Sequence, residues 1–375
     1  MNEGEFKQFF LTAHVTDQKP GVYKGAIALS KDGKQFDSIP VTLRVLPFVL
    51  PKPKTYFDIE KDFLVFFCEY ISFENIRGIN GNDQALAERQ LVSIMKNMVA
   101  HNQTSPSHRE QHRSDLINEA NMDMTYISAG SMQLTSFAEM KFHARHKMAE
   151  LKEKYPNSKE FFASWGDEYG LGILRGILPM VEVYKKQGFK FVSNSRHSYA
   201  GAGYLVDLFW PPVNPDSETY LPVDKFNFVT GNQGYFGWYA NQHVGVENPA
   251  FIRRQYGLGA YRGGFSCHFN YAHHLNGYND IRGNTYKSMN FFYGDGNGVI
   301  DTLSWEGFRE GMDDIRYATL LQQLARPLLT SKNFESQTAA RKAVQLLADM
   351  NTDDFDQTTA RLEMIRHILT LQKCK

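Results

Sequence analysis

The sequence predicts an α/β protein, a (β/α)8 TIM-type barrel preceded by a partial antiparallel β-sandwich and followed by a helical C-terminal end. From Thr55 to Tyr293, short apolar runs alternate with helical stretches, and this order implies parallel strands joined by right-handed crossovers. About eight such units in about 270 residues fit a barrel. We therefore expect a sandwich with a Pro-rich linker over 1–52, a catalytic barrel over 53–330 and a helical segment over 331–375.

The N-terminal part is predicted to be β-structure. Phe9–Val15 and Val22–Leu29 have the composition of strands, and Asp32-Gly33 before Ile39–Val45 is a hairpin signal. Three or four strands would leave one sheet face uncovered, so the sandwich is either truncated or packed on the next domain. Leu46–Lys54 carries three prolines, which is typical of a linker.

The barrel elements follow from hydrophobic periodicity and from chain breakers. Leu86, Leu91, Ile94 and Met98 lie near a 3.6-residue period, and Gly188 closes a later helix. The expected strands are Phe63–Phe67, Met122–Ile127, Phe161–Trp165, Phe189–Val192, Tyr204–Phe209, Gly234–Tyr239, Gly264–Tyr271 and Phe291–Tyr293. The expected helices are Asp83–Ala100, His112–Asn121, Phe137–Tyr155, Leu171–Gln187, Ile315–Ala325, Thr338–Met350 and Arg361–Leu371.

Composition excludes several classes of function. Lys plus Arg and Asp plus Glu both number 41, so the chain lacks the basic excess typical of proteins that bind nucleic acids or anionic membranes. The longest apolar run, Val45–Leu50, is far too short to span a bilayer. Cys68, Cys267 and Cys374 are scattered without a CxxC pair, which predicts free thiols and neither a zinc site nor a disulfide framework. We expect no cofactor and no metal.

One strand end carries the strongest catalytic signal. The apolar run Phe161–Trp165 leads into Asp167-Glu168, which Gly166 and Gly170 bracket. In a barrel, the active site lies at the carboxyl ends of the strands. Two close carboxylates raise the pKa of one of them, which suits a general acid beside an ionised partner. The alternative is a surface turn that uses Gly and Asp for its geometry.

Three segments together resemble the glycoside hydrolase family 123 group and its uncharacterised relatives. They are Lys19–Gly25 with the Pro-bearing exit behind it, the pair Asp167-Glu168, and Tyr293–Gly296 followed by Ser304–Tyr317. The last segment is similar to the Gly-Asp-Gly hairpin and the helix with an acidic pair that close the barrel in this group. The resemblance spans most of the chain and is stronger for fold than for substrate.

The resemblance implies a β-N-acetylgalactosaminidase with substrate-assisted, retaining catalysis. Asp167 would orient the acetamido group, and Glu168 would be the general acid/base. The chain departs from the family pattern where Tyr169 replaces the usual proline and where Phe265–Tyr271 replaces a Trp-rich strand. The identity of the sugar is therefore open. The family is secreted or periplasmic, whereas the start at Met1 shows no signal peptide, so either the protein is cytoplasmic or its natural start lies elsewhere.

Other residues that follow strand ends are candidates for contacts with a sugar. Aromatic faces stack on pyranose rings, and polar side chains bind hydroxyl groups. The candidates are Trp210, Trp238, Tyr239, Asn270, Tyr271, His197 and Glu69. Core packing is the alternative for each ring, and it is the stronger interpretation for Phe209 and Phe236. A plain loop histidine is the alternative for His197.

Competing motifs fit less well. His108 and His112 lack the glutamate placement of zinc proteases, and Gly257–Gly263 has the wrong spacing for dinucleotide binding. Asp313-Asp314 on a helix predicts a capped or solvated surface. Two other functions remain open. One is a two-carboxylate glycosidase in which Glu168 pairs with Asp207 or Glu247, and the other is a non-catalytic carbohydrate-binding protein. The sequence does not define the oligomeric state.

Overall fold

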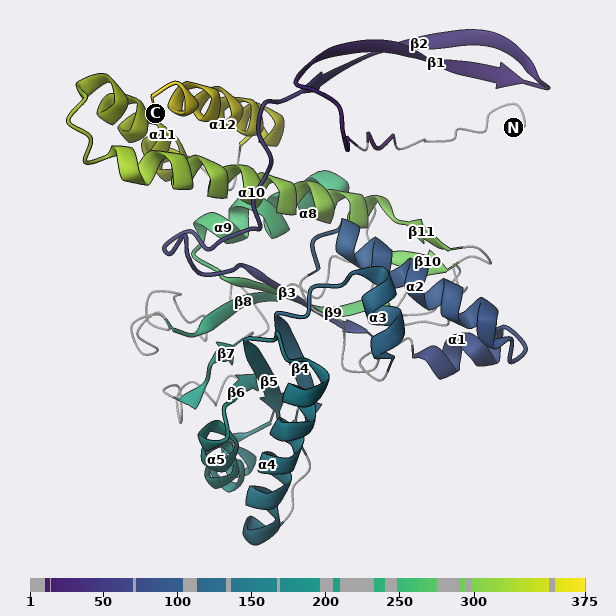
Figure 1. Cartoon of the computed structure of the whole chain (residues 1–375), viewed down its shortest axis with the longest axis vertical. Helices are drawn as coiled ribbons and strands as arrows, with labels where there is room; N and C mark the ends of the chain where they lie inside the picture. The colour runs from purple at the N-terminus through teal and green to yellow at the C-terminus, as the bar shows by residue number, and fades with distance from the viewer. Residues whose placement is uncertain are drawn as a thin grey trace. The chain divides into compact units, whose positions relative to one another are not determined.

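The structure is a computed structural model that describes residues 11–13, 15–69, 72–103, 113–132, 136–166, 169–195, 205–209, 233–239, 248–274, 290–294, 298–350 and 355–374. The chain divides into two compact units, Met1–Pro51 and Lys52–Lys375. Figure 1 shows their elements. No described helix is both long enough and apolar enough to cross a membrane.

The first unit contains an antiparallel hairpin of β1 (Gly21–Lys31) and β2 (Lys34–Val45). Asp32 and Gly33 have φ values of 50° and 74°. Positive φ at both central residues is what a two-residue turn of type I′ requires, so the predicted turn is confirmed. Leu11–Ala13 and Val15 form no strand, and the rest of the predicted strand Phe9–Val15 lies outside the described residues. The described part of the predicted sandwich is therefore one hairpin.

The second unit is built on a parallel seven-stranded sheet in the order β3-β9-β8-β7-β6-β5-β4. Its strands are β3 (Leu64–Glu69), β4 (Tyr126–Ser131), β5 (Glu160–Ser164), β6 (Phe189–Ser193), β7 (Leu208–Phe209), β8 (Tyr235–Tyr239) and β9 (Cys267–His274). The predicted last strand, β10 (Phe292–Gly294), instead pairs with β11 (Val299–Asp301) as a hairpin. The predicted TIM-type α/β fold is confirmed, with seven strands in the described sheet.

The inner face of the sheet is filled by side chains from all seven strands. Phe162 of β5 lies 5.4 Å from Phe66 of β3 and 6.5 Å from Tyr126 of β4, measured between ring centroids. Since β3 and β4 are the two ends of the strand order, these contacts show that the sheet curls around a packed interior. Cys267 is buried there, and burial raises the pKa of its thiol.

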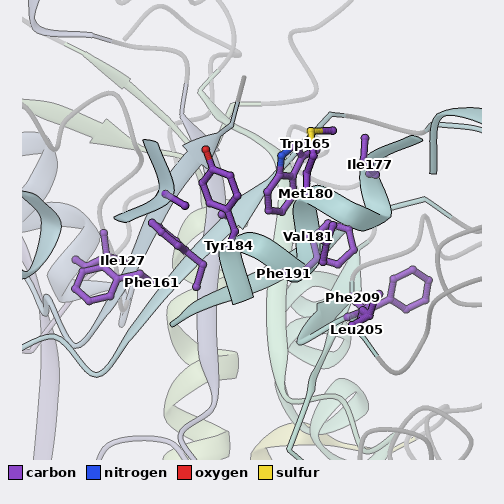
Figure 2. Packing of buried hydrophobic residues seen from close by; sticks show 14 of the residues in the cluster. Ile127, Phe161, Trp165, Ile177, Met180, Val181, Tyr184, Phe191, Leu205 and Phe209 are labelled. Carbon is purple, nitrogen blue, oxygen red and sulfur yellow. The ribbon is translucent and has the colours of Figure 1, made fainter. Parts of the chain in front are cut away.

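Helices cover the outer face of the sheet. α4 (Phe137–Lys154) and α5 (Leu171–Lys186) bury a large apolar cluster against β4, β5 and β6, which Figure 2 shows from close by. Both helices of the predicted ranges begin at a capped residue, because Ser136 starts α4 with a capping box and Asp83 caps α2 (Gln84–Ala100). The remaining helices between β3 and β4 are α1 (Phe73–Ile79) and α3 (Ser114–Ala120).

Two helical segments pack closely at three glycines. α8 (Pro249–Arg254), the π-helical η2 (Gln255–Gly259) and α9 (Ala260–Arg262) lie against α10 (Leu303–Leu328). A Cβ atom on Gly257 would lie 2.9 Å from Gly311 Cα, and one on Gly307 would lie 2.4 Å from Pro249 O. Only glycine permits this approach. Gly257, the first glycine of the segment compared above with a dinucleotide-binding loop, therefore serves helix packing.

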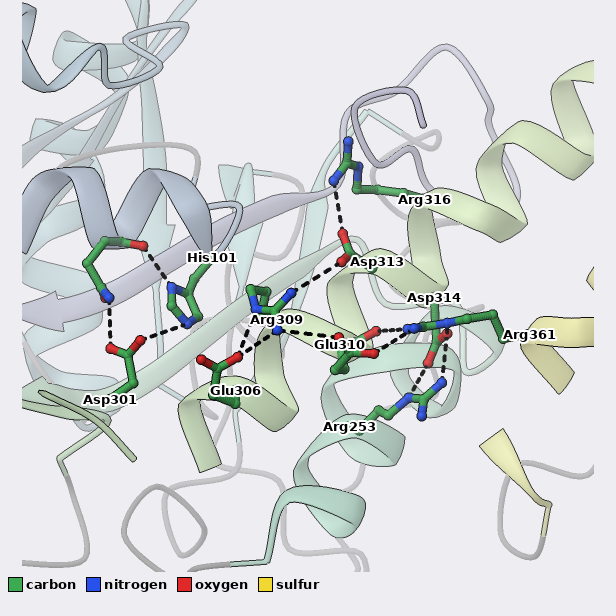
Figure 3. Close-up of polar contacts among 11 residues, drawn as sticks. His101, Arg253, Asp301, Glu306, Arg309, Glu310, Asp313, Asp314, Arg316 and Arg361 are labelled. Carbon is green, nitrogen blue, oxygen red and sulfur yellow. Dashed lines mark hydrogen bonds and ion pairs between the residues drawn. The ribbon is translucent and has the colours of Figure 1, made fainter. Parts of the chain in front are cut away.

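Buried ion pairs connect α10 to α8 and to α12 (Gln357–Gln372), and α11 (Phe334–Asp349) also packs on α10. Figure 3 shows Asp314 between two guanidinium groups. Its Oδ2 accepts from Arg253 Nε at 2.7 Å, and its Oδ1 accepts from Arg361 Nε at 2.5 Å. The exposed fraction of Asp314 is 0%, so the prediction of a solvated acidic pair is wrong for this residue.

Candidate active site

The predicted site residues fall into three groups by what the structure describes. Asp167, Glu168, His197 and Trp210 lie outside the described residues. Glu69, Tyr239, Asn270 and Tyr271 are described as strand backbone. Glu69 pairs with His274 and Tyr239 pairs with Phe269, so these positions lie in the carboxyl-terminal parts of β3, β8 and β9. That edge of the sheet is where the sequence predicts the site.

Trp238 is the one predicted site residue whose side chain is described. Its ring packs edge-to-face on Phe265 at 5.0 Å and joins the cluster between the sheet and its helices. This is the core placement that the sequence left open as an alternative, and a role in sugar binding stays a prediction. Phe209 and Phe236 are fully buried in the same cluster, which confirms their expected core role.

The residues on both sides of Asp167-Glu168 are held firmly. Before the pair, Trp165 is buried against Tyr184 and Phe191, with ring centroids 5.0 and 5.4 Å away (Figure 2). Gly166 then adopts φ 150°, a conformation that side-chain-bearing residues rarely take. The predicted role of glycine as a turn residue at this strand end therefore agrees with its backbone conformation.

After the pair, Tyr169 is bound to the carboxyl end of β6. Its hydroxyl group lies 2.9 Å from Ser193 Oγ, and its carbonyl oxygen accepts a hydrogen bond from Ser195 Oγ. Ser195 N donates to Ser193 Oγ at 3.1 Å, which closes the group. All three residues are buried. The sequence showed Tyr169 only as a departure from the family pattern, because its partners lie more than twenty residues further along the chain.

A second polar group lies at the opposite, amino-terminal edge of the sheet, and sequence reasoning missed it. Lys61 contacts Gly234 O and lies 4.4 Å from the centroid of the Tyr235 ring. Burial lowers the pKa of Lys61 to about 8 and raises the pKa of Glu160. The only sequence signal for this group is that Lys61 and Glu160 each lie just before an apolar run.

Asp207 belongs to this amino-terminal edge. It precedes β7, pairs with Lys185 and accepts a hydrogen bond from Phe191 N at 2.7 Å. β5, by contrast, runs toward Asp167-Glu168 with its carboxyl end, which is the opposite edge of the parallel sheet. Asp207 thus lies away from the edge where the sequence predicts the site, and its pairing with Glu168, which lies outside the described residues, stays a prediction. Glu247, the other candidate, lies outside the described residues.

One cluster among the described residues has the donor types of a metal site. Oxygen or nitrogen atoms of His101, Asp301 and Glu306 lie within 4.8 Å of one another where β11 meets α10 (Figure 3). Protein groups already serve two of these residues, because Asn97 donates to Asp301 at 2.7 Å and Arg309 donates to Glu306 at 2.7 Å. The positive charge of Arg309 would repel a bound cation. We therefore infer that these contacts fix the β10–β11 hairpin to α2 and α10.

Comparison with known proteins identifies the fold. No family model and no curated protein matches the sequence. Among solved structures, the chain is similar to a family 123 glycoside hydrolase from Clostridium perfringens, with a TM-score of 0.62 and 13% sequence identity. The match covers 95% of this chain and 77% of that one. The fold is that of a family 123 glycoside hydrolase. The resemblance seen in the sequence is thus confirmed for the fold.

Proposed function

We propose that the protein is a glycoside hydrolase that removes a terminal β-linked 2-acetamido-2-deoxy sugar, most favourably N-acetylgalactosamine, with retention of configuration. The observation that carries this proposal is the acidic pair Asp167-Glu168, which follows the carboxyl end of β5 in a barrel of the family 123 fold. The similar enzyme is described as acting in hydrolysis of glycolipid glycans, which supports an oligosaccharide substrate here.

The proposed reaction needs no protein nucleophile. The acetamido oxygen of the substrate attacks the anomeric carbon while Glu168 donates a proton to the departing glycosidic oxygen. Asp167 accepts a hydrogen bond from the amide N–H and stabilises the positive charge of the resulting oxazolinium ion. Glu168 then removes a proton from water, which attacks the anomeric carbon and restores the acetamido group. Two displacements at the same carbon give net retention.

The proposal is tested by hydrolysis of chromogenic β-GalNAc, β-GlcNAc, β-Gal and α-linked substrates. We expect β-GalNAc to be cleaved fastest and an oxazoline-mimicking thiazoline to inhibit the reaction. Cleavage of 2-hydroxy sugars at rates equal to those of acetamido sugars would rule out the substrate-assisted mechanism. Sugar binding without turnover of any substrate would instead favour the carbohydrate-binding alternative.

Two substitutions separate the roles of the carboxylates. Glu168→Gln is expected to lower kcat by about 10²–10⁴-fold while sugar binding persists, since it removes a general acid/base. Asp167→Asn is expected to slow acetamido substrates selectively. Glu153→Gln on the exposed face of α4 is a matched control that leaves the rate unchanged. Full activity of Glu168→Gln would overturn the assignment of the acid/base.

A further inference from the structure

We propose that Tyr169 is a positioning residue, and that its hydrogen bonds to Ser193 and Ser195 fix the chain directly after Asp167-Glu168 to the end of β6. This inference rests on the proposed function, because positioning matters only if the pair performs the chemistry. It concerns the point where the chain departs from the family pattern, with a tyrosine in place of the usual proline.

The hydrogen bonds form a closed group of three residues. Tyr169 Oη lies 2.9 Å from Ser193 Oγ, Ser195 Oγ donates to Tyr169 O, and Ser195 N donates to Ser193 Oγ at 3.1 Å. The exposed fractions of Tyr169, Ser193 and Ser195 are 4%, 1% and 2%. Buried polar groups are costly when unpaired, so these hydroxyl groups favour one arrangement of the β5 and β6 ends.

The Tyr169 ring also lies beside Gly166, the residue that directly precedes the acidic pair. A Cβ atom on Gly166 would lie 3.6 Å from Tyr169 Cδ1, so the residues directly before and after Asp167-Glu168 are in close contact. The preceding strand end is fixed as well, because Met132 N donates to Ser164 O at 2.7 Å. The two ends of the acidic loop are therefore joined to each other and to both neighbouring strands.

The role of Tyr169 is positioning, since its ring belongs to the apolar cluster between the sheet and its helices. A proline at this position would restrict the backbone through its own ring. Tyrosine leaves the backbone freer, and the hydrogen bonds to β6 supply the restriction from outside the loop. Rates depend steeply on such placement, because a misplacement of about 1 Å can cost about 10²-fold.

The test compares two Tyr→Phe substitutions in the same cluster. Tyr169→Phe removes the hydroxyl group that reaches Ser193, whereas Tyr184→Phe removes the hydroxyl group of a tyrosine that is 3% exposed and packs on Trp165. We expect Tyr169→Phe to lower kcat on β-GalNAc by about 10–100-fold with KM changed less than about threefold. Tyr184→Phe should keep both constants near those of the wild type.

Two further readouts separate positioning from general loss of structure. Tyr169→Phe and Ser193→Ala both remove the Tyr169–Ser193 hydrogen bond, so their combined loss of kcat should be smaller than the product of the two single losses, although Ser193→Ala also removes the acceptor of Ser195 N. Amide hydrogen exchange at Gly166, Tyr169 and Gly170 should be faster in Tyr169→Phe and unchanged in Tyr184→Phe.

The outcomes are distinguishable. A Tyr169→Phe variant with the kcat of the wild type would overturn the positioning role and leave the proposed function intact. Equal losses of kcat in Tyr169→Phe and Tyr184→Phe would also overturn it, since the effect would then belong to core packing. A wild-type protein that hydrolyses none of the sugars would overturn the proposed function, and exchange would still report whether Tyr169 fixes the loop.

Discussion

Replacing Gly311 with alanine should destabilise the contact between α10 and the α8–η2 segment. The added Cβ atom would lie 2.8 Å from Arg253 O, 3.1 Å from Gly257 N and 3.2 Å from Gly257 Cα. All three are backbone atoms, so no side-chain rotation relieves the overlap. Overpacking costs about 1–3 kcal/mol, and contacts with fixed backbone place Gly311→Ala at the upper end of that range. The higher helix propensity of alanine returns about 1 kcal/mol, which leaves a net loss of about 2 kcal/mol.

The matched control is Gly176→Ala in α5. Gly176 is an exposed residue inside a helix, and a Cβ atom there would meet nothing within 4 Å. The same substitution should therefore raise the free energy of unfolding by about 0.5–1 kcal/mol. Urea unfolding followed by far-UV circular dichroism measures both variants. If Gly311→Ala proves as stable as Gly176→Ala, the close approach of α10 to η2 is wrong.

Two further predictions concern buried carboxylates. Burial raises the pKa of Asp301 from 3.8 to about 6. Between these two pH values the folded state holds a proton on Asp301 that the unfolded state has lost, so the free energy of unfolding falls as pH rises from about 4 to about 6. Asp301→Asn should therefore be more stable than the wild type above about pH 6, by up to about 3 kcal/mol, and equally stable below about pH 4. Urea titrations of both proteins across this pH range measure the difference. Asp314→Asn removes the carboxylate that Arg253 and Arg361 share, and because Arg361 keeps its pair with Glu310, we expect a loss of about 3 kcal/mol, the lower end for a broken buried pair. Glu363→Gln, which breaks the pair with the exposed Arg366, should hardly change the urea midpoint; equal losses in both variants would contradict the role of burial.

Local signals predicted most elements of the fold, because the determinants of each lie within a few residues. The hairpin at Asp32-Gly33 follows from two residues that tolerate positive φ, and α2 follows from the Asp83 cap and its apolar period. The helical segment over residues 249–262 was not predicted. Gly257, Gly259 and Gly263 disfavour a helix locally. Two of them are required by packing, because a Cβ atom would lie 2.9 Å from Gly311 Cα at Gly257 and 2.7 Å from Arg254 O at Gly259.

The sequence predicted the location of the candidate site more readily than the contacts among its residues. The run from Phe161 to Gly170 identifies a strand that ends in two carboxylates. Which ring faces the core depends on strand alternation and neighbours, as Trp238 against Phe265 shows. The partners of Tyr169 come from the next strand, and only the structure shows that Asp207 pairs with Lys185 just before β7. Such facts depend on register between distant segments, which composition and periodicity do not encode.

The most specific part of the sequence resemblance concerns packing more than chemistry. In the helix Leu303–Leu328, Gly307 and Gly311 permit close contact with α8 and η2, and Asp314 binds Arg253 and Arg361. Each of these residues would be required for this fold whatever substrate the barrel binds. The fold can therefore persist at 13% identity, whereas the proposed chemistry depends on the acidic pair that follows β5. Substitutions in α10 should then change stability with kcat preserved in the folded fraction, whereas Tyr169→Phe should lower the kcat of the folded fraction in addition to any loss of stability. If both sets of substitutions lowered kcat and stability in proportion, this separation between a packing helix and a catalytic loop would be wrong.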